Sequence, residues 1–515
     1  MHTTSEIAEP AAGARMGRAD GVADGGGRDA PAEAFWVRAV GWRARVALAV
    51  GAGALLACAY ALHPQAWAPW LAPVPLLAGS LASRRHAALA GWLTGAVSLA
   101  SVLPYYVAMT GWAAALLIAL LRAGSWAFAT RLTQAGVSRG LPLPLAMLVL
   151  PVACAAVELL TLVASPHGAA GSLAYSQMGT AAVVQVAALG GVPAVVFLVL
   201  LPGSWAGLRI ARPWPRAQRW AAVGMLAAVA AAAAAFAAVR LKTAALGPGV
   251  PVTLLGTNGG ARHSRDWAAI WATYGPSVVR FAPRGGLVVM PEKLALLDVA
   301  GATQAARDVG VAARSTGATL VVGLEVHDGH TFRNRALVAA ADGRVAWYDK
   351  QRLVPGWEDR DTPGTKPLVV GAGATRVGIA ICKDLHVPAI GREYAGAAAL
   401  LAVPAWDFGE DGWMGARMAA LRAIEGGYAV ARSARDGMLG AYDAAGRVIL
   451  EQPVTDAMTI AQVTLPVPHP ARANTPYVYR TVYGRAGDAF GWACVVGSVW
   501  LLAWTARRGR TRLAP

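Results

Sequence analysis

The chain has 515 residues, of which 56% are hydrophobic and only 15% charged, and its mean hydropathy is +0.44. This composition excludes an ordinary soluble protein, because apolar blocks of about 20 residues, long enough to cross a ~30 Å hydrocarbon core, fill most of the chain before residue 245. The net charge of +17 comes largely from arginines that flank these blocks. That is the pattern of a membrane protein rather than of a nucleic-acid groove, so we expect a membrane protein with no nucleic-acid partner.

The first part of the chain indicates a tail followed by membrane spans. Residues 1–43 are rich in Gly, Ala and charged residues without an apolar period, which predicts a disordered cytoplasmic tail and no signal peptide. Eight apolar segments are candidate spans: 44–62, 67–83, 87–104, 111–130, 141–163, 181–207, 219–239 and 488–505. The second contains three prolines, and we expect it to be kinked or partly re-entrant.

The positions of the basic residues predict the orientation of these spans. With the N-terminus in the cytoplasm, the arginine-rich loops all lie inside, and the seven spans of a membrane domain over 44–242 place residues 243–487 outside. The last span, 488–505, then returns a basic tail, 506–515, to the cytoplasm. Within the spans, Arg122 and Glu158 are costly in lipid: we expect Arg122 to snorkel or to line a cavity, and Glu158 to be satisfied within the bundle or near the mouth of the site. The polar loop 165–177 is expected at the outer interface, beneath the extracytoplasmic domain.

Residues 243–487 have a different sequence pattern, in which short runs of β-forming residues alternate with stretches of helical character. This alternation predicts an α/β domain. Three of the runs end in a reactive side chain: "GLVVMPE" in Glu292, "GRVAWYDK" in Lys350 and "RVGIAIC" in Cys382. Cys382 is also the only cysteine of this region.

An acid, an amine and a thiol at strand ends form a coherent constellation, because sites of α/β sheets gather at the carboxyl ends of strands. A thiol needs a base to become a nucleophile, and Glu292 is placed to take its proton. A protonated Lys350 would stabilise the oxyanion formed when sulfur attacks a carbonyl. Taken singly, each has a structural explanation: a packed cysteine, a first-turn glutamate and a solvated hairpin lysine.

The motifs around these residues resemble the apolipoprotein N-acyltransferase family, a membrane branch of the nitrilase, or carbon–nitrogen hydrolase, superfamily. The resemblance rests on "VVMPE", "YDKQRLVPGWE", "GIAICKD", the stretch 418–448 and "TPYVYRTVYGRAGD" in the domain. In the membrane half it rests on "PWLAPVPLL", "GWLTGAVSLASVLPYY" and "GSLAYSQMGTAAVVQVAALGGVPAVVFL". It covers roughly residues 44–505.

This resemblance implies an α-helical membrane bundle of about eight spans carrying an extracytoplasmic nitrilase-like α-β-β-α sandwich. It implies a Glu292–Lys350–Cys382 triad with a second glutamate, Glu358, and no cofactor or metal. The implied reaction moves an acyl chain from a membrane phospholipid, through a Cys382 thioester, to the N-terminal amine of a diacylglyceryl-cysteine on a lipoprotein. The implied location is the inner membrane, with the catalytic domain on the periplasmic side.

The chain also departs from the family pattern. Cys-Tyr-Glu is replaced by Cys382-Lys383-Asp384, and the Asn-Asp pair before Trp406 is missing. We expect Lys383, Asp384 and Trp406 to lie around the substrate, so these changes bear on substrate identity. An aspartate two residues after the cysteine is common among soluble members that cleave small amides. A membrane-anchored amidase that uses water therefore stays open as an alternative, and so does a scaffold that only binds lipid or lipoprotein.

Two histidine patterns have simpler interpretations. "HDGH" at 327–330 indicates a turn rather than a metal site, because the sequence places no third ligand nearby. His386 lies beyond the strand that ends at Cys382, in a segment that precedes Pro388, and we do not expect a Cys–His pair.

Overall fold

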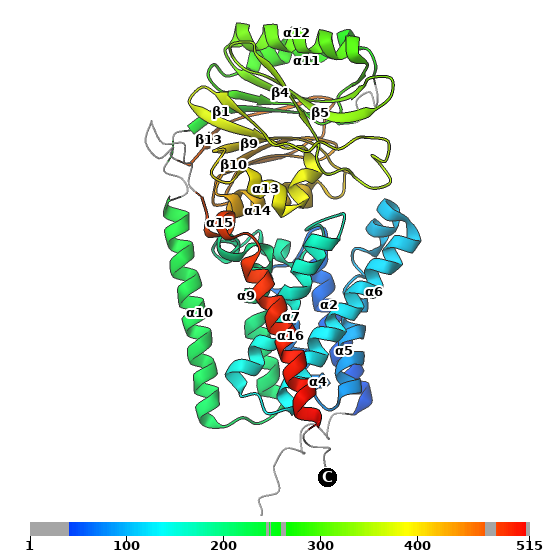
Figure 1. Ribbon diagram of the computed structural model, residues 1–515, viewed down its shortest axis with the longest axis vertical. Coiled ribbons are helices and arrows are strands. Elements are labelled where there is room, and N and C mark those ends of the chain that lie inside the picture. Colours follow the sequence, from blue (N-terminus) through cyan, green and yellow to red (C-terminus); the bar gives the residue numbers. More distant parts are fainter. Residues whose placement is uncertain (1–40, 244–246, 248, 259–263, 469–479, 511–515) are drawn as a thin grey trace, which may run out of the picture.

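The computed structural model describes residues 41–243, 247, 249–258, 264–468 and 480–510. Most of the expected N-terminal tail, the end of the basic tail and residues 475–479 of the last family motif lie outside the described residues. The membrane half consists of helices α2 (Trp42–Tyr60), α3 (Ala68–Leu71), α4 (Pro73–Ser80), α5 (Arg84–Val97), α6 (Leu103–Ser138), α7 (Leu143–Ala164), η2 (Leu173–Gln177), α8 (Ala181–Val184), α9 (Ala187–Ala211) and α10 (Arg216–Thr243). Helix α16 (Ala489–Arg510) joins this bundle after the α/β domain (Figure 1).

Among the described residues, six helices are long and apolar enough to cross a membrane: α2, α6, α7, α9, α10 and α16. The expected spans 67–83 and 87–104 correspond to shorter helices, α3, α4 and α5, of 4, 8 and 14 residues. The expected break in the second span is present, since α3 ends at Leu71 and α4 begins at Pro73. The count of eight spans stays a prediction.

The α/β domain contains two sheets. The first has the strand order β13-β1-β2-β4-β5-β6, with β3 paired to β4, and the second has the order β12-β11-β10-β9-β8-β7. In the first sheet the strands are β1 (Gly249–Gly256), β2 (Leu287–Val289), β3 (Leu296–Leu297), β4 (Thr319–His327), β5 (Phe332–Ala339), β6 (Val345–Asp349) and β13 (Thr459–Pro466). In the second they are β7 (Leu368–Ala372), β8 (Thr375–Ile379), β9 (Leu400–Trp406), β10 (Ala429–Arg435), β11 (Met438–Tyr442) and β12 (Val448–Pro453).

The two sheets pack face to face, and helices cover both outer faces. One apolar core joins side chains of the two inner faces, among them Val252 and Val289 of the first sheet and Ile379 and Ala402 of the second. Helices α11 (Trp267–Phe281) and α12 (Val299–Thr316) pack on the outer face of the first sheet. Helices α13 (Pro388–Tyr394) and α14 (Gly412–Gly426) lie between the second sheet and the bundle (Figure 1). The domain is therefore an α-β-β-α sandwich, as the family resemblance implies.

Local sequence explains where the two outer helices begin. Asp266 and Asp298 cap α11 and α12, their carboxylates accepting hydrogen bonds from the backbone N–H groups of Ala269 and Gly301. Helix α12 ends at Gly317, whose φ of +69° is the left-handed conformation that glycine adopts without strain.

The loop 165–177 contacts the α/β domain, as expected from its polarity. The Ala169 N–H donates to the His386 carbonyl oxygen at 2.7 Å, so the loop lies directly beneath the segment that follows Cys382. Arg122 reaches the same loop: its guanidinium lies 3.7 Å from the centre of the Tyr60 ring and donates to the Gly171 carbonyl oxygen at 3.2 Å.

Helices α5 and α6 approach each other through two glycines spaced four residues apart. A Cβ atom at Gly91 would meet the Trp126 carbonyl oxygen at 2.5 Å, and one at Gly95 would meet the Ala123 Cα and the Arg122 carbonyl oxygen at 2.7 Å. This is the small-xxx-small arrangement that lets backbones of membrane helices pack closely without a hydrophobic driving force.

We expect Gly95→Val to lower the stability of the bundle, because its side chain has no room and α6 must move away. Overpacking of this kind costs about 1–3 kcal/mol, measurable as a lower thermal unfolding midpoint in detergent. Gly124→Val is the matched control, since a Cβ at this α6 position meets nothing within 4 Å. Equal midpoints for the two variants would contradict close packing of α5 on α6.

Candidate functional site

The structure places the three expected residues just past three different strands. Glu292 follows β2, Lys350 directly follows β6, and Cys382 follows β8. The first two strands belong to one sheet and β8 to the other, so the site lies where the ends of the facing sheets meet. The backbone makes the same link, since the Glu292 N–H donates to the Ala405 carbonyl oxygen of β9 at 3.2 Å.

Lys350 is the centre of a buried ion network. Its Nζ donates to Glu292 Oε1 at 2.7 Å and to Glu358 Oε2 at 2.9 Å. Asn334 joins the same two carboxylates, its Nδ2 donating to Glu292 Oε1 at 2.5 Å and to Glu358 Oε1 at 2.6 Å. The four side chains are almost fully buried, with exposed fractions between 1% and 5%. The structure therefore brings together three of the four residues to which the resemblance gives a catalytic role.

The network fixes the charges of its members. Burial alone would lower the pKa of Lys350, but the carboxylates of Glu292 and Glu358 raise this pKa well above its usual value. Burial alone would raise the pKa of Glu358, yet the Lys350 and Lys293 ammonium groups and two hydrogen bonds lower it to about 2. Lys350 is consequently a cation and Glu358 an anion throughout the neutral range.

Glu292 keeps one oxygen available. Its Oε1 accepts two hydrogen bonds, whereas its Oε2 is buried and has no hydrogen-bond partner among the described residues. A buried carboxylate oxygen without a partner is costly and requires an explanation, of which a catalytic role is one. Lys350 likewise uses two of the three N–H donors of its ammonium group in these contacts.

Cys382 lies in a strained backbone conformation at a sharp turn. Its φ is +41°, which is unfavourable for a residue with a Cβ atom, and it begins the short helix η3 (Cys382–His386). The thiol is half-buried and lies 3.5 Å from the Trp406 carbonyl oxygen. Burial, and next the Glu292 charge, raise the pKa of Cys382, while Lys350 and Arg432 lower it. The thiol is therefore protonated at rest, and a nucleophilic reaction requires a base.

Asp384 anchors this turn from inside the protein. One oxygen accepts from the Ile381 N–H at 2.9 Å and the Tyr348 hydroxyl at 2.8 Å. The other accepts from the N–H groups of residues 351 and 352 at 3.0 and 2.8 Å. Asp384 is fully buried, so we assign it the positioning of Cys382 against the Lys350 loop rather than the substrate contact expected from the sequence.

Lys383 ties the same two segments together from the other side. Its Nζ donates to the Leu353 carbonyl oxygen at 2.8 Å, and the next residue, Val354, donates its N–H to Glu358 Oε2 at 2.8 Å. Burial, and then repulsion from Lys350, lower the pKa of Lys383 to about 8. Its amine thus holds the loop that carries Glu358, whereas we expected it to lie around the substrate.

Trp406 and a second buried ion pair form the opposite wall. The Trp406 indole N–H donates to Asp436 at 3.0 Å, and the Arg435 guanidinium lies 4.6 Å from the ring centre. Beside it, Arg432 makes a two-pronged ion pair with Asp407, and both side chains are almost fully buried. His386 is also near, but burial and the positive charges around it keep its pKa well below the usual value, so it is neutral.

Two supporting residues were not predicted from the sequence. The position of Asn334 could have been predicted from the Asp342-Gly343 turn, which sets the register of the β5–β6 hairpin. In this register Asn334 lies opposite Lys350, whose N–H donates to the Asn334 carbonyl oxygen at 2.9 Å. No sequence pattern predicts the role of Lys293, because its ion pairs with Glu358 at 3.1 Å and Asp361 at 2.9 Å depend on the folding of a later loop.

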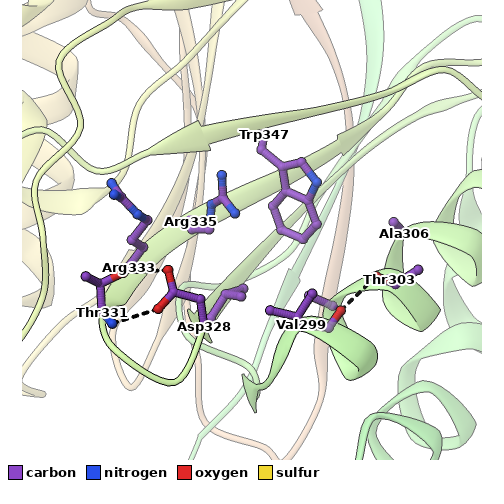
Figure 2. Close-up of a pocket in the computed structure, with 10 residues that line it drawn as sticks. Val299, Thr303, Ala306, Asp328, Thr331, Arg333, Arg335 and Trp347 are labelled. Carbon is purple, nitrogen blue, oxygen red and sulfur yellow. Dashed lines mark hydrogen bonds between the residues drawn. The ribbon is translucent and has the colours of Figure 1, made fainter.

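A hollow of about 290 Å³ lies elsewhere in the domain, between α12 and the outer face of the β5–β6 hairpin (Figure 2). Its polar groups are engaged locally: Arg335 pairs with Asp349 at 2.6 Å, and Asp328 accepts from Thr331 at 2.9 Å and 2.8 Å. The Asp328 contacts confirm the turn expected at 327–330. None of the residues that line this hollow belongs to the Glu292–Lys350–Cys382 site.

Comparisons with known proteins point to one family. Residues 52–205 match the model of the apolipoprotein N-acyltransferase N-terminal domain. An apolipoprotein N-acyltransferase of Geobacter metallireducens is 28% identical over 166 residues, which make up 30% of this chain and 29% of that protein. The chain resembles the apolipoprotein N-acyltransferase family. The matched stretch spans less than a third of the relative's length.

Solved structures similar to the chain come from the nitrilase superfamily. A CN-hydrolase superfamily protein of Xanthomonas campestris is 21% identical, with a TM-score of 0.37 over 42% of this chain and 91% of its own. An amidase of the nitrilase superfamily from Nesterenkonia is 22% identical, with a TM-score of 0.38 over 43% and 92% of the two chains. The resemblance to the apolipoprotein N-acyltransferase family that the motifs predict is supported by the match of residues 52–205 to the family model.

The lowered pKa of Lys383 predicts a pH-dependent stability. Between pH 8 and about 10.5, the usual pKa of lysine, the unfolded chain binds this proton and the folded chain does not, so the free energy of unfolding rises with pH. We expect thermal midpoints in detergent to rise over this range in the wild type and less steeply in Lys383→Met. Lys242→Met, at an exposed lysine, controls for the loss of one amine. Parallel curves for the wild type and Lys383→Met would contradict the burial of a charged amine here.

Proposed function

We propose that the chain is an N-acyltransferase that moves an acyl chain from a membrane phospholipid to the N-terminal amine of a diacylglyceryl-cysteine on a lipoprotein, through a thioester on Cys382. The observation that carries the proposal is the buried network in which Lys350 fixes one oxygen of Glu292, while the other oxygen has no hydrogen-bond partner in the described part of the chain. A base and a cation are thereby held ready beside a thiol that is protonated at rest.

The first half-reaction forms the thioester. Glu292 Oε2 takes the thiol proton while Cys382 Sγ attacks an ester carbonyl carbon of the phospholipid. Lys350 stabilises the resulting oxyanion, and Glu358 keeps Lys350 charged and in place. The carbon–oxygen bond to the glycerol then breaks, and Glu292 returns the proton to the alkoxide, which leaves as a lysophospholipid.

The second half-reaction forms an amide. The free amine of the lipoprotein attacks the thioester carbonyl, and Glu292 accepts one amine proton. The carbon–sulfur bond breaks, and the thiolate of Cys382 regains the proton from Glu292. The enzyme returns to its starting state, and the acyl chain is now bound to nitrogen. Bond by bond, an ester is exchanged for an amide, so no cofactor is required.

The membrane half supports lipid substrates for this chemistry. The site belongs to a domain that stands on apolar helices, and the loop 165–177 contacts the segment after Cys382 directly. Both substrates carry acyl chains, and a site next to the bilayer surface receives them without removing the chains from lipid. We place the protein in the inner membrane with this domain on the periplasmic side, in keeping with the distribution of basic residues.

Intact-protein mass spectrometry tests the thioester. Wild-type protein in detergent with added phospholipid is expected to gain one acyl group that hydroxylamine removes, and Cys382→Ala is expected to gain none. Cys58→Ala, at an exposed cysteine of α2, is the matched control and should acylate like the wild type. Glu292→Gln should slow acylation by about 10²–10⁴-fold, because it removes the general base. Acylation of Cys382→Ala would sink the proposal.

The acceptor is decided by adding a diacylglyceryl-cysteine peptide to the acylated protein. Transfer predicts that the acyl mass leaves the protein and appears on the peptide. Release as free fatty acid, with or without peptide, would favour the hydrolase alternative. No acylation of any variant would leave a scaffold that binds lipid or lipoprotein.

A further inference from the structure

A second ammonium group lies within the buried network, one residue after Glu292. Lys293 Nζ lies 2.9 Å from Asp361 Oδ2 and 3.1 Å from Glu358 Oε1. The Glu325 carboxylate follows at 3.8 Å, and the Lys293 side chain is only 10% exposed. Three carboxylates therefore surround this ammonium group, which has no part in the proposed acyl transfer steps.

The backbone at Lys293 is strained. Among the described residues, a positive φ outside glycine occurs at Lys293 (+51°), Cys382 (+41°) and Asp436 (+51°). Asp436 also belongs to the site, because it accepts from the indole of Trp406, whose carbonyl oxygen lies against the Cys382 thiol. Such conformations persist only where their surroundings hold them, and they cluster at active sites. At Lys293 the Arg435 guanidinium contributes, donating to the Lys293 carbonyl oxygen at 2.9 Å.

Charge balance indicates what this ammonium group does. Glu292, Lys350 and Glu358 together carry two negative charges and one positive charge, and an oxyanion beside Lys350 would add a third negative charge. The two lysines contact different oxygens of Glu358, Lys350 at Oε2 and Lys293 at Oε1. Burial alone would raise the pKa of Glu358, but these two cations lower it to about 2.

Two further carboxylates face Lys293, and they differ. Glu325 is already paired with Arg360 at 2.7 Å, so it draws less on the Lys293 charge. Asp361 accepts from Lys293 through Oδ2, whereas its Oδ1 is buried and has no hydrogen-bond partner among the described residues. Asp361 therefore competes with Glu358 for the same ammonium group.

We propose that Lys293 is a positioning residue, which keeps Glu358 ionised and in contact with Lys350 and thereby keeps the site active at acidic pH. This role rests on the proposed function for its reaction. Removing the Lys293 ammonium group should raise the pH below which the network takes up a proton. Removing its competitor Asp361 should lower that pH.

The pH profile of thioester formation tests this role on the full-length protein in detergent. Lys293→Asn is the first variant, because asparagine tolerates a positive φ and carries no charge. The pH at which its acylation rate falls to half of the plateau should rise by about 1–3 pH units, the effect of one nearby opposite charge on a carboxylate. Lys293→Arg should restore the wild-type profile. Lys366→Asn, at an exposed lysine of the same loop as Glu358, should leave it unchanged.

Asp361→Asn separates charge from packing. Its profile should shift to lower pH, because Glu358 no longer shares the Lys293 charge with a second buried carboxylate. A loss of packing alone would slow both variants at every pH and would not shift their profiles in opposite directions. If Lys293→Asn folds poorly, Asp361→Asn still decides the result.

Alkylation of Cys382 by iodoacetamide, followed by peptide mass spectrometry, gives the same comparison without lipid, since the protonated thiol requires the same base. If the wild type forms no thioester, the proposed function fails, and the alkylation profiles still decide the role of Lys293. Identical profiles for the wild type, Lys293→Asn and Asp361→Asn would overturn this role. Shifts of both variants in the same direction would overturn it as well.

Discussion

The site depends on the contact of one buried ammonium group with two carboxylates. Placing Lys350, Glu292 and Glu358 out of water costs several kcal/mol per ion, and their mutual attraction offsets this cost only if geometry and hydrogen bonds are nearly complete. Asn334 and the Val354 N–H supply the remaining hydrogen bonds to the carboxylates. Among the described residues, the network leaves Glu292 Oε2 and Asn334 Oδ1 without a hydrogen-bond partner, and Glu292 Oε2 is the atom at which the proposed chemistry requires an acceptor.

The segment after Cys382 explains how a strained turn stays in place. A φ of +41° in a non-glycine residue costs of order 1–3 kcal/mol, and four hydrogen bonds to Asp384 hold the turn against it. Two of those bonds come from the segment after Lys350, and Lys383 adds a third link to the same segment. Cys382 and Lys350 are therefore positioned by one shared set of contacts, and a displacement of one segment displaces the other.

Much of this site could be predicted from the sequence because its reactive residues stand where apolar runs, which predict strands, come to an end. Apolar runs that stop at Glu292, Lys350 and Cys382 place an acid, an amine and a thiol at sheet edges, and the Asp342-Gly343 turn places Asn334 opposite Lys350. The inward orientation of Lys383 and Asp384 could not be predicted, since a charged pair after a strand faces water as readily as protein. Only the packing of the loop after Lys350 against the turn decides it, and that contact spans more than 30 residues of sequence.

The α/β domain and the bundle are joined, as the parts of the site are, by a buried carboxylate that accepts a hydrogen bond. Glu425 on α14 accepts a hydrogen bond from the Val192 N–H, at the point where Gly190 and Gly191 break the helical geometry of α9. The break frees a backbone donor inside the bundle, and the Glu425 carboxylate from the α/β domain accepts its hydrogen bond. Because α14 also packs on η3, which begins at Cys382, the position of Cys382 is tied to helix α9 through two successive contacts. A domain held this way keeps its position relative to the helices of the bundle, which the proposed transfer between lipid-anchored substrates requires.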